Sequence, residues 1–177
     1  RSLSFQPWGS EPTRHEFQGG DLYGVIERLD YLQEFGITCL YLTPVFSSAA
    51  NHRYHTYDYL EIDPILGGNE ALETLIEALH RRQMRLILDG VFNHCGRAFW
   101  AFHHLLENGE KSPYKDWFVI NQSTLLPYSN PGDQCGYSCW WNDPALPKFN
   151  HKHQPVCDYL ISVATYWIEK GIDGWRL

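Results

Sequence analysis

The sequence predicts an α/β fold in which helix–strand units follow one another along the chain and build a parallel sheet. Three segments carry apolar residues at the spacing of an amphipathic helix. Each is followed, after a short break, by an apolar run rich in β-forming residues. This alternation is typical of βα units, whose right-handed crossover connections place the strands side by side in one parallel sheet.

The first unit begins with apolar residues at helical spacing between Asp21 and Phe35, and Gly36 follows as a stop signal. The next run, "ITCLYLTPVF" (37–46), is continuous and apolar. We expect it to form a strand that is buried on both faces, as strands of parallel sheets usually are.

The second and third units repeat this order. A helix is predicted to start near Asn69, and "MRLILDGVF" (84–92) is the next buried strand. The third helix lies in "QPVCDYLISVATYWIEKG" (154–171), and the third strand in "IDGWRL" (172–177). Four residues mark the buried face of the second helix: Leu72, Leu75, Ile76 and Leu79.

Residues 95–153 separate the second predicted strand from the third helix. They are rich in Pro, Gly, Asn and Trp and have weak periodicity. A loop of this length without structure of its own is uncommon in a compact domain, so we interpret the segment as a small inserted subdomain.

Composition and charge restrict the class of protein. Hydrophobic residues make up 44% of the 177 residues and charged residues 20%, which is typical of a globular domain. The net charge of −7 leaves no basic stripe for phosphates, so no nucleic acid is expected as a partner. No apolar run approaches the ~20 residues that span a bilayer, so no membrane partner is expected. The 7 tryptophans and 11 tyrosines suit a neutral ligand such as a sugar, and suit a packed core equally well.

The 5 cysteines favour a reducing compartment and a cytoplasmic location, because an odd number spread over a chain of this size is poor evidence for a disulfide framework. "CGYSC" (135–139) followed by "HKH" (151–153) invites comparison with a zinc motif. The cysteines are spaced C-x3-C, but the two histidines are only one residue apart and miss the usual H-x3–5-H spacing, so zinc is not expected.

Polar residues close each predicted strand. Thr43 closes the first, Asp89 and then His94 the second, and Arg176 the third. In a parallel sheet or barrel these strand ends lie on one face, where ligands bind; the alternative is that they only cap the rim. We favour a shared site in which Asp89 and Arg176 form a charge-assisted pair and His94 contacts the ligand.

The stretch "NHRYHTYDY" (51–59) follows the first strand and is expected to form a loop at the mouth of this site. Tyr54 is either a stacking platform for a sugar ring or a packing aromatic, and its position favours the platform. Asp58 is expected to hold the loop by accepting hydrogen bonds from backbone amides.

Four stretches carry a resemblance to one known family: "DGVFNH" (89–94), "GIDGWRL" (171–177), "HRYHTYDYLEIDPILGG" (52–68) and "LPKFN" (146–150). The chain resembles the α-amylase family of glycoside hydrolases, in its neopullulanase and cyclomaltodextrinase branch. The first stretch is similar to the family signature D-x-x-x-N-H, and the second to G-x-D-G-x-R-x-D. The third is similar to the loop after the second barrel strand, and the fourth to the late part of the inserted domain.

The resemblance covers essentially the whole chain and implies part of a (β/α)8 TIM barrel with a small domain inserted after the third strand. It implies three parts. Residues 1–94 hold barrel strands two and three, residues 95–153 are the inserted domain, and residues 154–177 return with helix three and strand four.

The resemblance also implies a role for each site residue. Among the catalytic residues, Arg176 holds the nucleophile and Asp89 organises the site. Among the substrate-binding residues, Tyr54 stacks on the sugar where cleavage occurs, and His94 and His52 contact the substrate.

Asn93 matches a position that binds calcium in many α-amylases, although neopullulanase-like members often lack that ion, and the insert offers no convincing second ligand. His55 departs from the pattern, because many relatives have Asp there. Calcium is thus an expectation tied to Asn93 alone.

The implied activity of the intact parent is retaining hydrolysis of α-glucosidic bonds in maltooligosaccharides, cyclodextrins or pullulan, so the expected partner is an α-glucan oligosaccharide. The nucleophile would stand two residues after Arg176, outside the 177 residues, as would the general acid, so we expect the chain alone to be inactive. Alternatives are a non-catalytic carbohydrate-binding or scaffold protein, or an α-glucan transglycosylase or isomerase. The open sheet edges of a partial barrel lead us to expect a homo-oligomer.

Overall fold

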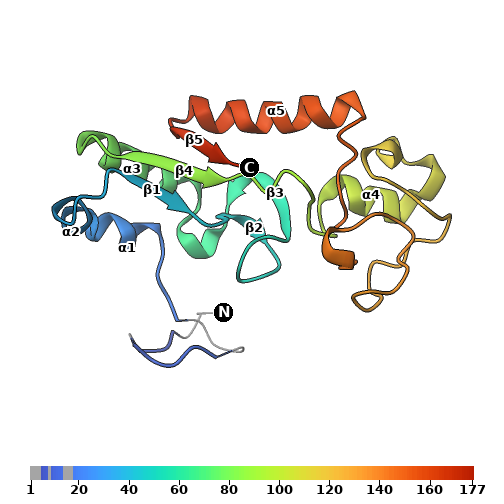
Figure 1. Cartoon of the computed structure of the whole chain (residues 1–177), viewed down its shortest axis with the longest axis horizontal. Coiled ribbons are helices and arrows are strands. Elements are labelled where there is room, and N and C mark those ends of the chain that lie inside the picture. The colour runs from blue at the N-terminus through green and yellow to red at the C-terminus, as the bar shows by residue number, and fades with distance from the viewer. Residues whose placement is uncertain (1–4, 8, 14–17) are drawn as a thin grey trace.

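The computed structural model describes residues 5–7, 9–13 and 18–177, and it is organised around a small parallel sheet with an irregular lobe beside it (Figure 1). No helix in these ranges has the length and apolar character needed to cross a membrane. In chain order the elements are α1 (Leu22–Glu27), α2 (Leu29–Glu34), β1 (Cys39–Leu42), β2 (Phe46–Ser48), β3 (Thr56–Ile62), η1 (Pro64–Leu66), α3 (Gly68–Arg81), β4 (Arg85–Asp89), α4 (Trp100–Asn108), η2 (Gly109–Lys111), η3 (Lys115–Trp117), η4 (Trp140–Asn142), α5 (Gln154–Glu169) and β5 (Gly174–Arg176).

The parallel sheet has the order β1-β4-β5, so each of the three predicted strand segments contributes one strand to it. Tyr41 pairs with Ile87 across β1 and β4, and Leu88 pairs with Trp175 across β4 and β5. Helix α5 lies along β5 in Figure 1, and the Trp175 indole donates a hydrogen bond to its backbone at 3.4 Å. The predicted helix–strand alternation is confirmed.

Strand β1 differs from the expectation of a strand buried on both faces. It has alternating exposed and half-buried residues, and the Tyr41 side chain is 46% exposed. The reason is its place in the sheet, because β1 is an edge strand that pairs with β4 alone among the described residues. The predicted strand 37–46 is also split, and its end forms β2, which pairs with β3 in an antiparallel ribbon.

Strand β3 lies partly in the stretch that was expected to be a loop. In the stretch 51–59, residues 51–55 lack strand structure, and β3 begins at Thr56. Asp58 accepts a hydrogen bond from the Leu60 amide at 2.8 Å, so it does bind backbone, but inside the strand.

The predicted first helix is two helices. The Asp21 carboxylate caps α1 by accepting from the Gly24 amide at 2.8 Å, and the chain then leaves helical geometry at Arg28, with φ −104° and ψ 2°. Gly36, with φ +89°, follows the end of α2 as expected. The predicted starts of α3 and α5 are confirmed to within one residue.

The core lies between the sheet, the β2–β3 ribbon and helices α3 and α5. Trp167 of α5 is fully buried, packs its ring 5.7 Å from that of Phe46, and donates to the Tyr59 carbonyl at 2.7 Å. All four residues predicted for the apolar face of α3 are buried, which joins the helix to this core.

Residues 95–153 form the lobe around α4, on the right of Figure 1. Short 3-10 turns and isolated β-bridges, rather than a sheet, connect its segments. Its interior is aromatic, with Phe102 in contact with Phe118 and Tyr137 at 4.9 Å between ring centroids. One bridge, between His94 and Lys148, joins this lobe to the segment that follows β4.

Candidate functional site

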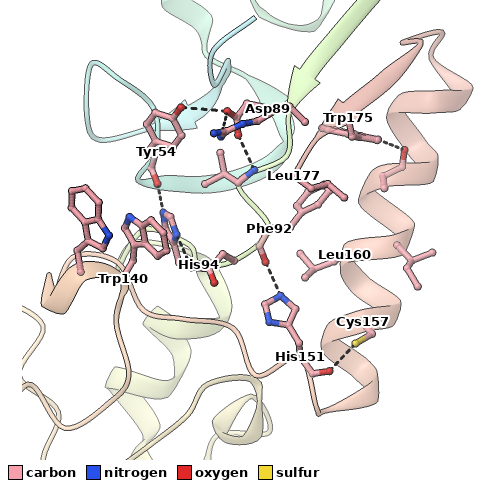
Figure 2. A pocket seen from close by; sticks show the side chains of 16 residues that line it. Tyr54, Asp89, Phe92, His94, Trp140, His151, Cys157, Leu160, Trp175 and Leu177 are labelled. Carbon is pink, nitrogen blue, oxygen red and sulfur yellow. Dashed lines mark hydrogen bonds and ion pairs between the residues drawn. The ribbon is translucent and has the colours of Figure 1, made fainter. Parts of the chain in front are cut away.

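The register of the sheet brings two predicted site residues together. Asp89 is the last residue of β4 and pairs directly with Arg176, the last residue of β5. The Arg176 Nη1 atom donates to Asp89 Oδ2 at 2.9 Å (Figure 2). The predicted pair therefore forms, and it forms because neighbouring parallel strands end at the same level.

The Asp89 carboxylate also accepts hydrogen bonds from two tyrosines, and its side chain is only 2% exposed. The Tyr41 hydroxyl donates to Oδ2 at 2.6 Å, and the Tyr54 hydroxyl donates to the same oxygen at 3.3 Å. The other oxygen, Oδ1, accepts from the Val91 amide at 3.3 Å. A buried carboxylate with this many donors is held in one orientation.

Arg176 is less enclosed than its partner, with a side chain that is 56% exposed. The charge of Asp89 raises the pKa of the Arg176 guanidinium. The hydrogen bond to Asp89, together with burial, raises the pKa of Tyr41 to about 12. Tyr41 therefore stays a neutral donor at physiological pH, and Arg176 keeps exposed donors that can bind a second anion.

His94 lies next to this pair and is 5% exposed. Its Nε2 atom is 3.0 Å from the Tyr54 carbonyl oxygen, which can only accept, so Nε2 carries the proton. Burial lowers the pKa of His94, which favours the neutral ring. Nδ1 is then an acceptor and takes a hydrogen bond from the Asn93 amide at 3.3 Å. Both ring nitrogens have protein partners, so a sugar hydroxyl must share or replace one of them.

The loop between β2 and β3 places Tyr54 over the site, where its hydroxyl points to Asp89 in Figure 2. His52 accepts a hydrogen bond from the Tyr54 amide through Nδ1 at 3.2 Å, and its ring lies 5.8 Å from that of Tyr54. His52 is thus next to Tyr54, and of these two residues Tyr54 is the one that lines the cavity of the site.

Tyr59, which is fully buried, contacts the segment after β4 through its hydroxyl group. The Tyr59 hydroxyl lies 2.7 Å from the His94 carbonyl oxygen and 3.1 Å from the Val91 carbonyl oxygen, and its single proton can be donated to either one. These contacts, with the left-handed Val91 at φ +45°, fix the turn that presents His94.

Sequence reasoning missed two aromatic residues of the lobe, Trp140 and Trp141. The Trp140 ring stacks on His94 at 5.8 Å with an interplanar angle of 16°, and Trp141 stacks on Trp140 at 5.8 Å and 11°. We call these three rings the ring stack. Trp141 is 84% exposed and has left-handed backbone, with φ +50°. The adjacent Trp pair was the available signal, but no periodicity placed it next to strand β4.

The site residues line one cavity of about 940 Å³, of a size that accommodates a small molecule. One end of it is polar, with Asp89, Arg176 and His94, and the ring stack lies beside them. The other end is mostly apolar, lined by Leu160 and other residues of α5, with His151 and Cys157 beside them. Flat aromatic faces next to hydrogen-bonding groups suit a ligand with both apolar and hydroxyl surfaces.

The donors near Asn93 do not form an evident metal site. Its side chain is exposed and its amide is turned to His94. The part of the chain that the structure describes holds no group of three or more His, Cys, Asp or Glu residues that could bind a metal ion. Calcium prefers several carboxylate or carbonyl oxygens, so a calcium ion at Asn93 stays a prediction that rests on this one residue.

Comparison with known proteins gives a consistent match over nearly the whole chain. The family model described as "Alpha amylase, catalytic domain" matches residues 5–177. The chain is 50% identical over 174 residues to a cyclomaltodextrinase of Geobacillus thermopakistaniensis, covering 97% of this chain and 29% of the relative. It is 45% identical over 174 residues to neopullulanase 2 of Thermoactinomyces vulgaris, again with 97% and 29% coverage.

A solved structure agrees. The cyclic α-maltosyl-(1→6)-maltose hydrolase of Arthrobacter globiformis, in complex with maltose, has a TM-score of 0.91 and 40% sequence identity, covering 100% of this chain and 40% of that one. The prediction that the chain is part of a TIM barrel is confirmed. The chain spans less than a third of the two curated relatives described above.

Proposed function

Because the chain belongs to the α-amylase family, we propose that it is part of the catalytic barrel of a retaining glycoside hydrolase that cleaves α-glucosidic bonds. Its substrates in this proposal are maltooligosaccharides, cyclodextrins or pullulan. The observation that carries the proposal is the Asp89–Arg176 pair, at 2.9 Å, at the ends of neighbouring parallel strands in the cavity.

In this proposal Arg176 holds the nucleophilic carboxylate. Asp89 accepts from the Nη1 atom of the guanidinium, and the Arg176 side chain is still 56% exposed. An aspartate two residues after Arg176 would stand on the same face of the strand and could accept from the free donors. Asp89, with Tyr41 and Tyr54, fixes the guanidinium, which is a positioning role.

The substrate-binding surface consists of Tyr54, His94 and the ring stack, with His52 next to Tyr54. Glucose rings have flat apolar faces and a rim of hydroxyls, so they stack on aromatic rings while hydrogen bonds fix their orientation. The neutral His94 and the hydroxyl of Tyr54 supply such hydrogen bonds. Tyr54 is therefore proposed as a platform and not only as a packing residue.

Retaining hydrolysis needs two carboxyl groups ~5 Å apart, one as nucleophile and one as acid/base. The family pattern places both after Arg176, so the 177 residues alone supply positioning and binding but neither chemical step. The same proposal includes three further points. The chain divides into residues 1–94, 95–153 and 154–177, its location is cytoplasmic, and it associates with itself through open strand edges.

The decisive experiment uses native protein isolated from its source cells with an antibody against this chain. We expect it to hydrolyse β-cyclodextrin and pullulan, and NMR of the fresh product should show the α-anomer first. The purified 177-residue chain, assayed in parallel, should release no sugar.

Four other outcomes have different meanings. A first product in the β-configuration would contradict the retaining mechanism, and turnover by the chain alone would contradict the assignment of the missing carboxylates. Binding of maltotriose without any turnover by the native protein would favour the non-catalytic carbohydrate-binding alternative. Longer oligosaccharides as main products would favour the transglycosylase.

A further inference from the structure

Two cysteines of the lobe lie with their sulfur atoms in contact, at a place that the proposed function does not use. The Sγ atoms of Cys135 and Cys139 are 3.7 Å apart. Cys135 is buried, with 3% exposure, and Cys139 is partly exposed. All five cysteines lie in the residues that the structure describes, and all are free thiols. Cys135 and Cys139 are the pair joined by a sulfur–sulfur hydrogen bond.

The backbone that carries the two thiols is fixed on both sides. The Cys135 carbonyl accepts from the Leu126 amide at 2.8 Å, and Cys139 forms a β-bridge with Pro147. Between them Gly136 has φ +90°, and a Cβ there would lie 2.1 Å from the Thr124 carbonyl oxygen. The turn therefore requires glycine, and it brings the thiols together without further ordering of the chain.

The partly exposed Cys139 is the thiol that a small reagent can reach. Both line a second, polar hollow of about 550 Å³, together with Lys148. A sulfur–sulfur bond is ~2.05 Å long, so the atoms at 3.7 Å need only a small approach to form one.

We propose that Cys135 and Cys139 form a redox modification site, a dithiol that small-molecule disulfides convert to an intramolecular disulfide. Oxidised glutathione is the reagent class. The Cys139 thiolate attacks one sulfur of the reagent, forms a mixed disulfide and releases one glutathione thiolate. Cys135 loses its proton to solvent, attacks the Cys139 sulfur and displaces the second glutathione. Two protein thiols are oxidised, and one disulfide is reduced to two glutathione thiols.

The rate of the first step has a distinctive pH dependence. Burial, with the hydrogen bond to Cys135, raises the pKa of Cys139 to about 11. Because the thiolate is the nucleophile, the rate should rise about tenfold per pH unit up to that value. An ordinary exposed thiol would level off near pH ~8.5.

Disulfide formation also has a consequence for the neighbouring aromatic residues. Cys139 directly precedes Trp140, whose ring stacks on His94. Fixing the Cys139 sulfur to Cys135 restricts the segment that positions the ring stack. This consequence rests on the proposed function only in so far as the ring stack binds sugar; the chemistry of the dithiol does not.

The test uses the reduced 177-residue chain incubated with oxidised glutathione, alkylated and mapped by mass spectrometry. We expect one intramolecular disulfide, joining Cys135 and Cys139 within one tryptic peptide. Cys135→Ser should stop at the mixed disulfide on Cys139. The matched control Cys39→Ser removes an exposed thiol and should leave the disulfide yield unchanged.

Repeating the reaction in concentrated urea separates the effect of the fold from that of sequence proximity. Native folding should raise the yield of this pairing several-fold over the unfolded chain. Equal yields in both conditions, stable glutathione adducts on both cysteines, or pairing with Cys39 or Cys157 under native conditions would each overturn the proposal. Loss of catalytic activity plays no part in this test, so its failure is separate from failure of the proposed function.

Discussion

The two halves of the site are positioned by different means. Asp89 and Arg176 lie together because β4 and β5 are neighbours in a regular sheet, and one backbone register fixes both. Trp140 and Trp141 reach the same cavity from the irregular lobe, through isolated bridges and left-handed backbone. In the sheet half, mutations should therefore destabilise the protein by disrupting buried charges and their hydrogen bonds. In the lobe half, they should destabilise it by disrupting close contacts with the backbone.

The largest effect is expected from Asp89→Ala. Asp89 is 2% exposed and accepts from Tyr41, Tyr54, Arg176 and the Val91 amide, so its removal leaves four donors without this acceptor. We expect a loss of about 2–4 kcal/mol in the free energy of unfolding, the low end reflecting the partly exposed Arg176. Urea denaturation measures it.

A second Asp–Arg pair provides the matched control. Asp30 binds Arg82 at 2.7 Å, but the Asp30 side chain is 80% exposed. Asp30→Ala should cost less than about 1 kcal/mol, because solvent screens exposed ion pairs. Equal losses in the free energy of unfolding for Asp89→Ala and Asp30→Ala would show that burial of the carboxylate does not set the cost.

The next effect concerns the start of the lobe, where Gly96 packs against the β2–β3 loop. Its amide donates to the Thr56 carbonyl at 2.6 Å, and a Cβ would lie 2.5 Å from the His55 carbonyl oxygen. Gly96→Ala should therefore destabilise by about 1–3 kcal/mol through overpacking against backbone. Thermal unfolding followed by circular dichroism is a suitable measurement.

Gly24→Ala is the matched control, because a Cβ in helix α1 would meet only the Asp21 side chain, at 3.5 Å. Alanine favours helix over glycine, so this variant should be neutral or more stable by up to about 1 kcal/mol. A destabilisation by Gly24→Ala as large as that by Gly96→Ala would refute the steric explanation.

The sheet could be predicted because its signals are periodic and local. Apolar spacing gave α3 and α5, and the polar residues closing the strands gave Asp89 and Arg176. The prediction failed at β1, where burial depends on which strands lie beside it and not on its own composition. It failed again at Arg28, where one non-helical residue divides an otherwise periodic segment.

The lobe half could not be predicted, because nothing local in the sequence specifies it. Trp140 meets His94 only after the chain has made a long irregular path and returned through the bridge to Lys148. Tyr41 was missed for a related reason: it stands within an apolar run, and only its pairing beside β4 turns its hydroxyl to Asp89.

A smaller effect, dependent on pH, is expected at the opposite end of the sheet. Burial alone would raise the pKa of Asp173, but hydrogen bonds from His80, the Leu86 amide and Arg85 outweigh it and lower the pKa below 3.8. A lowered folded pKa gives stability that is complete above the unfolded value and is lost as the pH falls through the folded one. The stability advantage of the wild type over Asp173→Asn should thus be constant near neutral pH and shrink below about pH 4.

Denaturation of both proteins at a series of pH values tests this, with Asp158→Asn as control. Asp158 is exposed and accepts from the neutral Gln154 side chain, so Asp158→Asn removes a carboxylate whose hydrogen-bond donor carries no charge. A wild-type advantage that does not shrink below about pH 4 would contradict the lowered pKa of Asp173.

The smallest effect on stability is expected from Trp141→Ala, and it is the one that tests the lobe as a binding surface. Trp141 is 84% exposed, and alanine would keep the same left-handed backbone, so the free energy of unfolding should change by less than about 0.5 kcal/mol. Loss of a stacking face should nevertheless weaken maltotriose binding up to about tenfold, measured by NMR titration. Tyr128→Ala is the matched control, since Tyr128 is 80% exposed and contacts Arg97 outside the cavity lining. If both variants bind maltotriose equally well, the ring stack is not a sugar platform, and substrate binding rests on the sheet half alone.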